Sequence, residues 1–373
     1  MKEIDRLIES ALEKGRFHGF QVGVYRDGSA LFERSYGDAP DTIYRVYSMT
    51  KPVTAAAVMT LVEKGGIDLL TPLSEILPEY AHMNRWEEDG AVPCERPILI
   101  RDLLNMTSGI CYPGTEGCAA QMQLLFDEIQ GKVETPKAYT TREVVRMAAR
   151  VPLAFEPGTK WGYGLSADVL GAVIEEVTGM SLREYYQRTI FEPLGMEDTD
   201  FYVPQEKRGR LSELYRIGEK GLEVETKRHL GLSFGCRVPA FQSGGAGLFT
   251  TLSDYSRFAR MLGGRGTFEG RRILSPGTVE FFTRDQMAWG VDTSGFFGQM
   301  RGYGYGNLMR VHTQPGNSGV FSSTGEFGWD GWTGPYFSVD LKTGLVLVTM
   351  TQVAEFGDYS LIRRLKNIVE SCF

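Results

Sequence analysis

Two residues with the chemistry of a nucleophile and its base, Ser48 and Lys51, form the only Ser-x-x-Lys sequence of the chain. A serine hydroxyl becomes a strong nucleophile when a neighbouring base accepts its proton, and a lysine whose pKa is lowered by burial can be that base. The tetrapeptide alone is weak support, because a chain of this length contains about one by chance. Taken alone, it is more simply explained as a helix cap followed by a solvated lysine.

A helix has to position this pair. Residues 53, 56, 57, 60 and 61 recur at helical spacing, and a glycine pair at 65–66 ends the pattern. Pro52 is tolerated only in a first turn, where its missing N–H loses no helical hydrogen bond. We therefore expect Ser48 and Lys51 on the opening turn and on one face, with backbone N–H groups nearby that could bind an oxyanion.

A second serine, Ser233, lies in a Gly-x-Ser-x-Gly sequence at residues 231–235. On an α/β-hydrolase fold this sequence marks the nucleophile, and Asp292 and His312 follow in the order of the acid and histidine of a triad. Such a serine needs a buried strand before it and a helix after it. Residues 219–229 are instead rich in charge, and residues 236–240 lead toward a glycine-rich loop. We expect Ser233 not to be the nucleophile and His312 to lie in a loop.

Composition excludes several classes of function. The 373 residues carry 40 Lys+Arg and 47 Asp+Glu, a net charge of −7 without a basic cluster, so no nucleic-acid partner is expected. The four histidines are too widely spaced for a zinc-hydrolase motif, and we expect neither a metal nor a cofactor. The glycine-rich segments 244–247 and 302–306 match no nucleotide-binding pattern and are expected to be tight turns.

The chain shows no sequence feature of secretion or of membrane insertion. Its five cysteines form no C-x-x-C pair, its first residues lack the apolar core of a signal peptide, and no run approaches roughly 18 apolar residues. We expect a cytoplasmic protein without a membrane partner, although a chain from which a leader had been removed would look the same. The oligomeric state is not predicted.

Both ends of the chain predict strands, and the middle predicts helices. Residues 21–25 and 30–36 form one expected hairpin, and residues 335–341 and 345–351 form another, between a first helix and a final helix at about 358–371. This predicts an α+β fold, an antiparallel sheet flanked by helices with a mainly helical inserted domain. We place the sheet domain at residues 1–65 and 236–373 and the insertion at 66–235, with the site at their interface.

Five ordered blocks surround and follow the Ser-x-x-Lys pair, at residues 44–54, 100–109, 156–163, 244–258 and 328–334. In this order the chain resembles the serine β-lactamase and penicillin-recognising hydrolase superfamily, in its class C-like branch. The resemblance runs from about residue 20 to about residue 352. Five blocks in this order are far more specific than the tetrapeptide alone. We therefore interpret Ser48 and Lys51 as a catalytic pair rather than as a helix cap and a solvated lysine.

The resemblance implies a role for each matching position. Ser48 would be the acylated nucleophile, Lys51 its proton partner, and Tyr163 a second proton carrier from the family's Tyr-x-Asn motif. The oxyanion hole would be the backbone N–H groups of Ser48 and Trp332. Trp329 and Gly331 match the family's Lys-Thr-Gly or His-x-Gly segment, which lines the substrate site.

Two departures bear on the substrate. Leu165 replaces the asparagine of Tyr-x-Asn, and Trp329 replaces a cation that would pair with a substrate carboxylate. The simpler alternative is that Trp329 and Leu165 serve only packing. Each lost charge-assisted hydrogen bond is worth roughly 1.5–3 kcal/mol. The combination resembles the family VIII carboxylesterases, with Trp329, Gly331 and Leu165 as substrate-binding residues.

We therefore expect a serine hydrolase that cleaves small neutral carboxylic esters through an acyl-serine. The alternatives are a β-lactamase, a D-amino-acid peptidase or an acyltransferase of the same fold, and a non-catalytic ligand-binding module. Residues 82–95 and 111–139 are candidates to cover the site and set its size.

Overall fold

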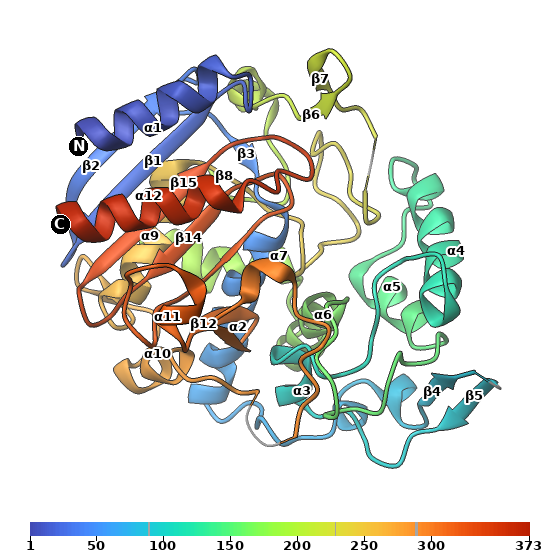
Figure 1. Ribbon diagram of the computed structural model, residues 1–373. Coiled ribbons are helices and arrows are strands. Elements are labelled where there is room, and N and C mark those ends of the chain that lie inside the picture. The colour runs from blue at the N-terminus through green and yellow to red at the C-terminus, as the bar shows by residue number, and fades with distance from the viewer. Residues whose placement is uncertain (89, 228, 288–289) are drawn as a thin grey trace.

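Seven antiparallel strands form the central sheet of the computed structural model, in the order β11-β12-β13-β14-β15-β1-β2 (Figure 1). The structure describes residues 1–88, 90–227, 229–287 and 290–373. The strands are β1 (Phe20–Arg26), β2 (Ser29–Tyr36), β11 (Tyr303–Gly306), β12 (Met309–His312), β13 (Phe327–Asp330), β14 (Tyr336–Val339) and β15 (Leu345–Met350). Pairing of β1 with β15 joins the two ends of the chain in one sheet.

Helices cover both faces of this sheet. On one face α1 (Lys2–Glu13) and α12 (Tyr359–Cys372) lie side by side (Figure 1). The buried face of α1 carries Ile4 and Ile8, which share a core cluster with Val22 and Val24 of β1. Because alternate residues of a strand point to opposite faces, Tyr25 faces the other way, toward α9 (Leu252–Gly263).

The remaining helices lie mostly in the middle of the chain. They are α2 (Thr50–Glu63), α3 (Ile100–Leu104), α4 (Gly117–Lys132), α5 (Thr141–Ala148), α6 (Ser166–Thr178), α7 (Leu182–Tyr186), α8 (Glu192–Leu194), α10 (Pro276–Phe282) and α11 (Pro315–Ser318). Local sequence sets several of their ends. Thr140 and Glu143 form a reciprocal capping box at the start of α5, and Gly179 ends α6 in the left-handed conformation.

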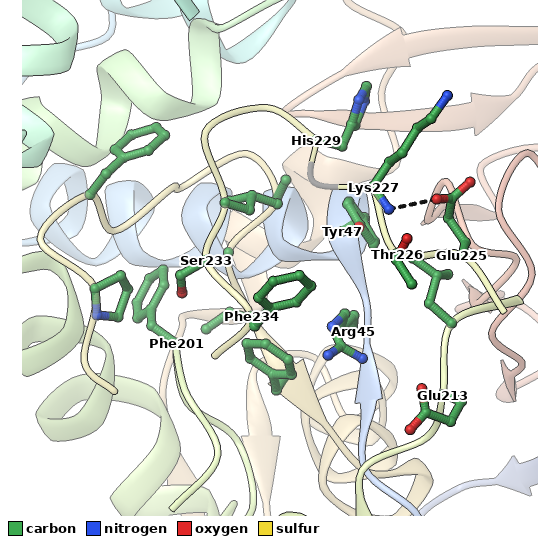
Figure 2. A pocket seen from close by; sticks show the side chains of 18 of the residues that line it. Arg45, Tyr47, Phe201, Glu213, Glu225, Thr226, Lys227, His229, Ser233 and Phe234 are labelled. Carbon is green, nitrogen blue, oxygen red and sulfur yellow. Dashed lines mark hydrogen bonds between the residues drawn. The ribbon is translucent and has the colours of Figure 1, made fainter. Parts of the chain in front are cut away.

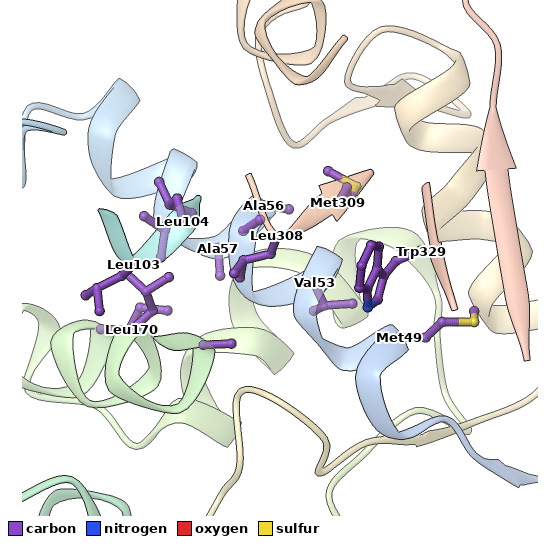
Figure 3. Close-up of a cluster of buried hydrophobic side chains, with 14 of the residues drawn as sticks. Met49, Val53, Ala56, Ala57, Leu103, Leu104, Leu170, Leu308, Met309 and Trp329 are labelled. Atoms are coloured by element: carbon purple, nitrogen blue, oxygen red, sulfur yellow. The ribbon is translucent and has the colours of Figure 1, made fainter. Parts of the chain in front are cut away.

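Helix α2 is buried on every side. Its residues from Thr50 to Leu61 are all buried, Lys51 and three threonines among them, so no side of this stretch faces solvent. Figure 3 shows Ala56 and Ala57 close to Leu308 of the turn before β12, and Val53 beside Trp329 of β13; Leu103 of α3 and Leu170 of α6 belong to the same cluster. The start of α2 is therefore held rigidly in the centre of the molecule.

Four short strand pairs complete the fold. They are β3 (Tyr44–Arg45) with β8 (Phe249–Thr250), β4 (Asn84–Glu87) with β5 (Gly90–Pro93), β6 (Tyr215–Gly218) with β7 (Gly221–Val224), and β9 (Thr267–Phe268) with β10 (Arg271–Arg272). The β3–β8 pair places the chain that leads into α2 beside the segment that follows the glycines at 244–247.

The α+β fold, the two terminal hairpins and the first and last helices are confirmed. All strands of the large sheet come from residues 20–36 and 303–350, while the expected domain boundaries stay a prediction. None of the helices in the described ranges combines the length and the apolar run that a membrane crossing requires.

Two local predictions are wrong. Residues 303–306 form strand β11 rather than a turn. Gly304 and Gly306 let Asp285 and Gln286 pack directly against this strand: a Cβ at Gly304 would lie 2.2 Å from Asp285, and a Cβ at Gly306 would lie 2.3 Å from Gln286. His312 is not in a loop either. It ends β12, is fully buried, and stacks on Tyr303 with ring centroids 4.8 Å apart.

Candidate active site

Ser48 lies in a 3₁₀ turn, Tyr47–Met49, immediately before α2. The turn is fixed by the amide of Val46, which donates to the carbonyl of Leu248 at 3.1 Å. Tyr47 has a φ of +42°, in the left-handed region that is costly for a bulky residue. The Ser48 side chain is half-buried and borders a cavity, so a small molecule can reach it.

Lys51 projects from the first turn of α2 toward Ser48 and is fully buried. Its Nζ lies 3.1 Å from Ser48 Oγ, 3.0 Å from the hydroxyl of Tyr112 and 2.8 Å from the carbonyl oxygen of Gly245, and donates to each. Burial lowers the pKa of Lys51 to about 7, against the opposing effects of Asp168 and Asp330. The amine can therefore exchange a proton with Ser48 near neutral pH.

Two tyrosines flank this ammonium. Lys51 Nζ lies 4.7 Å from the ring centroid of Tyr163 and 5.5 Å from that of Tyr112. Burial raises the pKa of Tyr163, although hydrogen bonds with Ser48 and Trp329 act the other way. The pKa of Tyr112 is also raised, chiefly by burial. Both phenols consequently keep their protons at neutral pH, which suits proton donation rather than service as a resting base.

The Tyr163 segment packs tightly against the segment that carries Tyr112. The amide of Gly162 donates to the carbonyl of Met106 at 2.9 Å. A Cβ at Gly164 would lie 1.9 Å from the carbonyl oxygen of Ile110, so no other residue fits without a shift of backbone. This close approach brings the two tyrosine rings to a centroid distance of 5.5 Å.

Strand β13 forms the opposite wall. The indole Nε1 of Trp329 donates to the hydroxyl of Tyr163 at 3.1 Å. Beyond the strand, a Cβ at Gly331 would lie 2.4 Å from the carbonyl oxygen of Val46, so glycine lets the end of β13 meet the turn that holds Ser48. Trp332 follows, and its N–H donates no hydrogen bond within the described part of the chain.

Buried carboxylates surround Lys51 at longer range. Asp168 accepts from Ser243 Oγ at 2.5 Å and from the amide of Gly245 at 3.1 Å, so it fixes the loop whose carbonyl receives Lys51. Asp330 pairs with Arg310 at 2.7 Å. Burial raises the pKa of both acids, and the neighbouring cations oppose that shift. Their negative charge favours the protonated form of Lys51 and partly offsets its burial.

A cavity of about 520 Å³ opens in front of Ser48. Its wall is largely aromatic and includes Tyr47, Tyr112, Phe126, Tyr163, Phe297, Trp329 and Trp332. Its charged groups are Asp127 and Asp330, and no lysine or arginine occurs among the described residues that line it. The cavity therefore suits an uncharged ligand better than an anion.

The structure brings Ser48, Lys51, Tyr163 and Trp329 together as the sequence predicts, and places Trp332 in the wall beside them. Leu165 lies in the hydrophobic core and does not border this cavity. Of the segments expected to cover the site, 111–139 contributes to the wall and the described residues of 82–95 do not.

Sequence reasoning missed Tyr112 as an individual residue. It follows the block at residues 100–109 by only three positions, and this proximity was the one available indication of its place.

The alternative nucleophile lacks its partners. Ser233 lies in a segment without helix or strand, and its Oγ accepts from the amide of Gly235. Asp292 is exposed and pairs with Lys160, while His312 hydrogen-bonds to Ser318 at 2.6 Å. The three residues form no triad.

Comparisons with known proteins agree with this arrangement. The family model described as Beta-lactamase matches residues 4–368. Esterase EstB from Burkholderia gladioli is 30% identical, over 95% of this chain and 91% of that protein. Protein Rv1367c from Mycobacterium tuberculosis is 32% identical, over 84% of this chain and 78% of that protein.

Among solved structures, EstCE1, described as a hydrolase with promiscuous acyltransferase activity, superposes with a TM-score of 0.81 and 25% identity. The match covers 99% of this chain and 97% of that one. The superfamily expected from the sequence motifs is thus confirmed, and the chain belongs to the Beta-lactamase family.

Proposed function

We propose that this protein is a serine carboxylesterase that hydrolyses small neutral esters through an acyl-serine at Ser48. The observation that carries the proposal is the set of hydrogen bonds around Lys51, in a cavity whose described wall holds no cation. The similarity to EstB and EstCE1 supports ester hydrolysis.

Acylation begins with transfer of the Ser48 proton to neutral Lys51, 3.1 Å away. The serine oxygen then attacks the ester carbonyl, and the backbone N–H groups of Ser48 and Trp332 bind the developing oxyanion. As the tetrahedral intermediate collapses, the C–O bond to the alcohol breaks. Tyr163 gives its proton to the departing alkoxide and regains one from the Lys51 ammonium beside it.

Deacylation repeats these steps with water in place of the alcohol. A water molecule loses a proton to the Lys51–Tyr163 pair, attacks the acyl carbon, and releases the carboxylic acid as Ser48 regains its proton. The hydroxyl of Tyr112 accepts a hydrogen bond from Lys51 Nζ. This bond orients the amine so that the nitrogen lone pair of Lys51 points at the reacting groups.

Substrate choice follows from the wall of the cavity. Trp329 offers one N–H, already bonded to Tyr163, where a cation would otherwise attract a carboxylate. The side chain of Leu165 packs in the core, so it does not contact substrate directly. Its effect on substrate choice is that the amide of the asparagine in the related motif is missing. We therefore propose neutral esters with poor turnover of β-lactams. Small-molecule esters would be the protein's partners and the cytoplasm its location.

A direct comparison of substrates tests the proposal. Wild-type enzyme should hydrolyse p-nitrophenyl acetate and butyrate faster than nitrocefin, and a fluorophosphonate should modify Ser48, as located by peptide mass spectrometry. The Ser48→Ala variant should lose activity and labelling, whereas Ser233→Ala should keep both. Faster hydrolysis of nitrocefin, or an adduct on Ser233, would overturn the assignment.

Acyl transfer to an alcohol is a second candidate function. The aromatic wall disfavours water relative to an apolar acceptor, and EstCE1 is described as having promiscuous acyltransferase activity. Product analysis of a p-nitrophenyl ester reaction with added butanol separates the two: transfer gives the butyl ester, and hydrolysis gives only the acid.

A further inference from the structure

A second cavity, of about 160 Å³, lies next to the active-site cavity (Figure 2). It is built around the β3–β8 strand pair and residues 224–227, 229, 232–234, 239 and 241. Buried apolar side chains form much of its wall, namely Phe201, Phe241, Leu248 and Phe249. Its polar side carries cations as well as acids, namely Arg45, Lys227, Glu213 and Glu225, and Figure 2 shows the two acids across the cavity from Phe201.

Among the residues that the structure describes, Tyr47 and His229 border both cavities. The His229 ring stacks on Trp332 at 4.9 Å between centroids, and the Tyr47 ring meets Trp332 edge-on at 5.1 Å. These three aromatic rings form one cluster, and two of them, Tyr47 and His229, lie where the two cavities meet. His229 is exposed and belongs to a segment without helix or strand, so its side chain can turn aside without breaking secondary structure.

We infer that the second cavity is a subsite for the apolar acyl chain of longer ester substrates, entered past His229. The inference rests on the proposed function and extends it from short esters to medium-chain ones. The occupant is the hydrocarbon chain of the acyl group attached to Ser48, because the cavity shares wall residues with the active site and Tyr47 is bonded directly to Ser48.

The side of the ester that enters follows from the positions of the proton donor and the oxyanion donors. The leaving alcohol has to lie near Tyr163, whose hydroxyl is bonded to Trp329. The carbonyl oxygen has to lie at the backbone N–H groups of Ser48 and Trp332. The acyl substituent is then directed away from Tyr163, along Trp332 and toward Tyr47 and His229.

The size of the cavity limits the length of chain. A cavity of about 150 Å³ can hold a benzene molecule, so this cavity of about 160 Å³ has room for about five or six carbons against its apolar side, Phe201, Phe241, Leu248 and Phe249. Each methylene moved from water into an apolar site favours binding by about fourfold. Octanoyl esters should therefore use the subsite, and acetyl esters should not reach it.

Filling the cavity tests the inference. Leu232 lines the second cavity and not the first, and is half-buried. With p-nitrophenyl octanoate and acetate as substrates, Leu232→Trp should lower the octanoate-to-acetate ratio of kcat/KM at least tenfold. Thr226→Phe, at the exposed rim of the cavity, should lower it in the same direction and serves if Leu232→Trp fails to fold. The matched control is Val238→Trp, an exposed position of the same segment outside the lining of the cavity.

Removing the His229 ring, which borders both cavities, tests the inference in the opposite direction. His229→Ala should raise the octanoate-to-acetate ratio several-fold. An unchanged ratio in Leu232→Trp and Thr226→Phe, with acetate still hydrolysed, would overturn the subsite and leave the esterase proposal standing. If wild-type enzyme hydrolyses neither ester, the proposed function fails and the subsite fails with it.

Discussion

The indole N–H of Trp329 donates a hydrogen bond to the phenol oxygen of Tyr163, 3.1 Å away. A neutral donor thus supports the tyrosine at a position where the related motif carries a cation. Since the indole has no acceptor atom, the phenol must direct its own proton elsewhere, toward Ser48 or the leaving group. This relationship can be tested by substitution.

Replacing Trp329 with Phe should lower kcat for p-nitrophenyl acetate by about threefold to tenfold, because a hydrogen bond of this kind is worth roughly 0.5–1.5 kcal/mol. Trp161→Phe is the matched control. Trp161 also stacks on Tyr163, at 5.9 Å, but its indole N–H has no partner in the described structure. Equal losses of kcat in both variants would show that packing, not the hydrogen bond, is responsible.

The pH dependence of kcat/KM should report Lys51. Because burial lowers the pKa of Lys51 to about 7, the amine is protonated below that pH and cannot accept the Ser48 proton. The rate should fall tenfold per pH unit on the acid side of about pH 7. Asp168→Asn removes a charge that raises this pKa, so the acid limb should move to lower pH. A limb that stays in place or moves upward would contradict Lys51 as the base; circular dichroism checks that the variant is folded.

The lowered pKa of Lys51 should also make the folding stability of the protein depend on pH. Between about pH 7 and the ordinary lysine pKa of 10.5, the unfolded chain holds a proton on Lys51 that the folded protein has released, so folding stability rises with pH. Lys51→Met removes this term. Urea denaturation at pH 7, 8.5 and 9.5 should show a difference in unfolding free energy, variant minus wild type, that shrinks as pH rises. A constant difference would mean that the pKa of Lys51 is not lowered.

Tyr112 and Tyr163 should differ in the size of their effect. Tyr163→Phe removes the proposed proton donor and should lower kcat by 10²-fold or more, as is typical of general acid–base groups. Tyr112→Phe removes one acceptor from Lys51 and should lower kcat by about tenfold. Steady-state kinetics with p-nitrophenyl butyrate measures both. The reverse order would exchange the roles proposed for the two residues.

Gly331 should tolerate no side chain. Gly331→Ala would place a Cβ 2.4 Å from the carbonyl oxygen of Val46, forcing β13 away from the Ser48 turn at a cost of roughly 1–3 kcal/mol. Both the unfolding free energy and kcat should fall. In contrast, Gly131→Ala, near the end of α4 with open space around it, should add about 0.5–1 kcal/mol without affecting kcat. Thermal unfolding followed by circular dichroism distinguishes the two.

Prediction from sequence succeeded where local pattern and position in the fold coincide. The Ser48–Lys51 spacing is a property of one helix start, and the terminal hairpins carry their own turn residues, so both were accessible without tertiary information. Burial of α2 on all sides was not, because it depends on what packs around the helix. The spacing of residues 53, 56, 57, 60 and 61 indicates a helix but not what surrounds it.

Prediction failed where the structural role of a residue depends on a contact with a residue far away in the chain. Gly304 and Gly306 serve close contact with Asp285 and Gln286 rather than a turn. Tyr112 acquires its place only when the segment after α3 packs against the Tyr163 segment and reaches Lys51, 61 positions earlier. Neither contact produces a periodic residue pattern that could be recognised in the sequence.

The pairing of β1 with β15 has a consequence for synthesis of the protein. Val22 and Val24 of β1 pair with Thr349 and Leu347, which leave the ribosome about 320 residues later. At roughly 5–20 residues per second, the first hairpin waits about 15–65 s with one edge and one apolar face uncovered. The nascent chain therefore presents an aggregation-prone strand until its partner emerges, and we expect chaperone dependence in the cell to concentrate on residues 20–36.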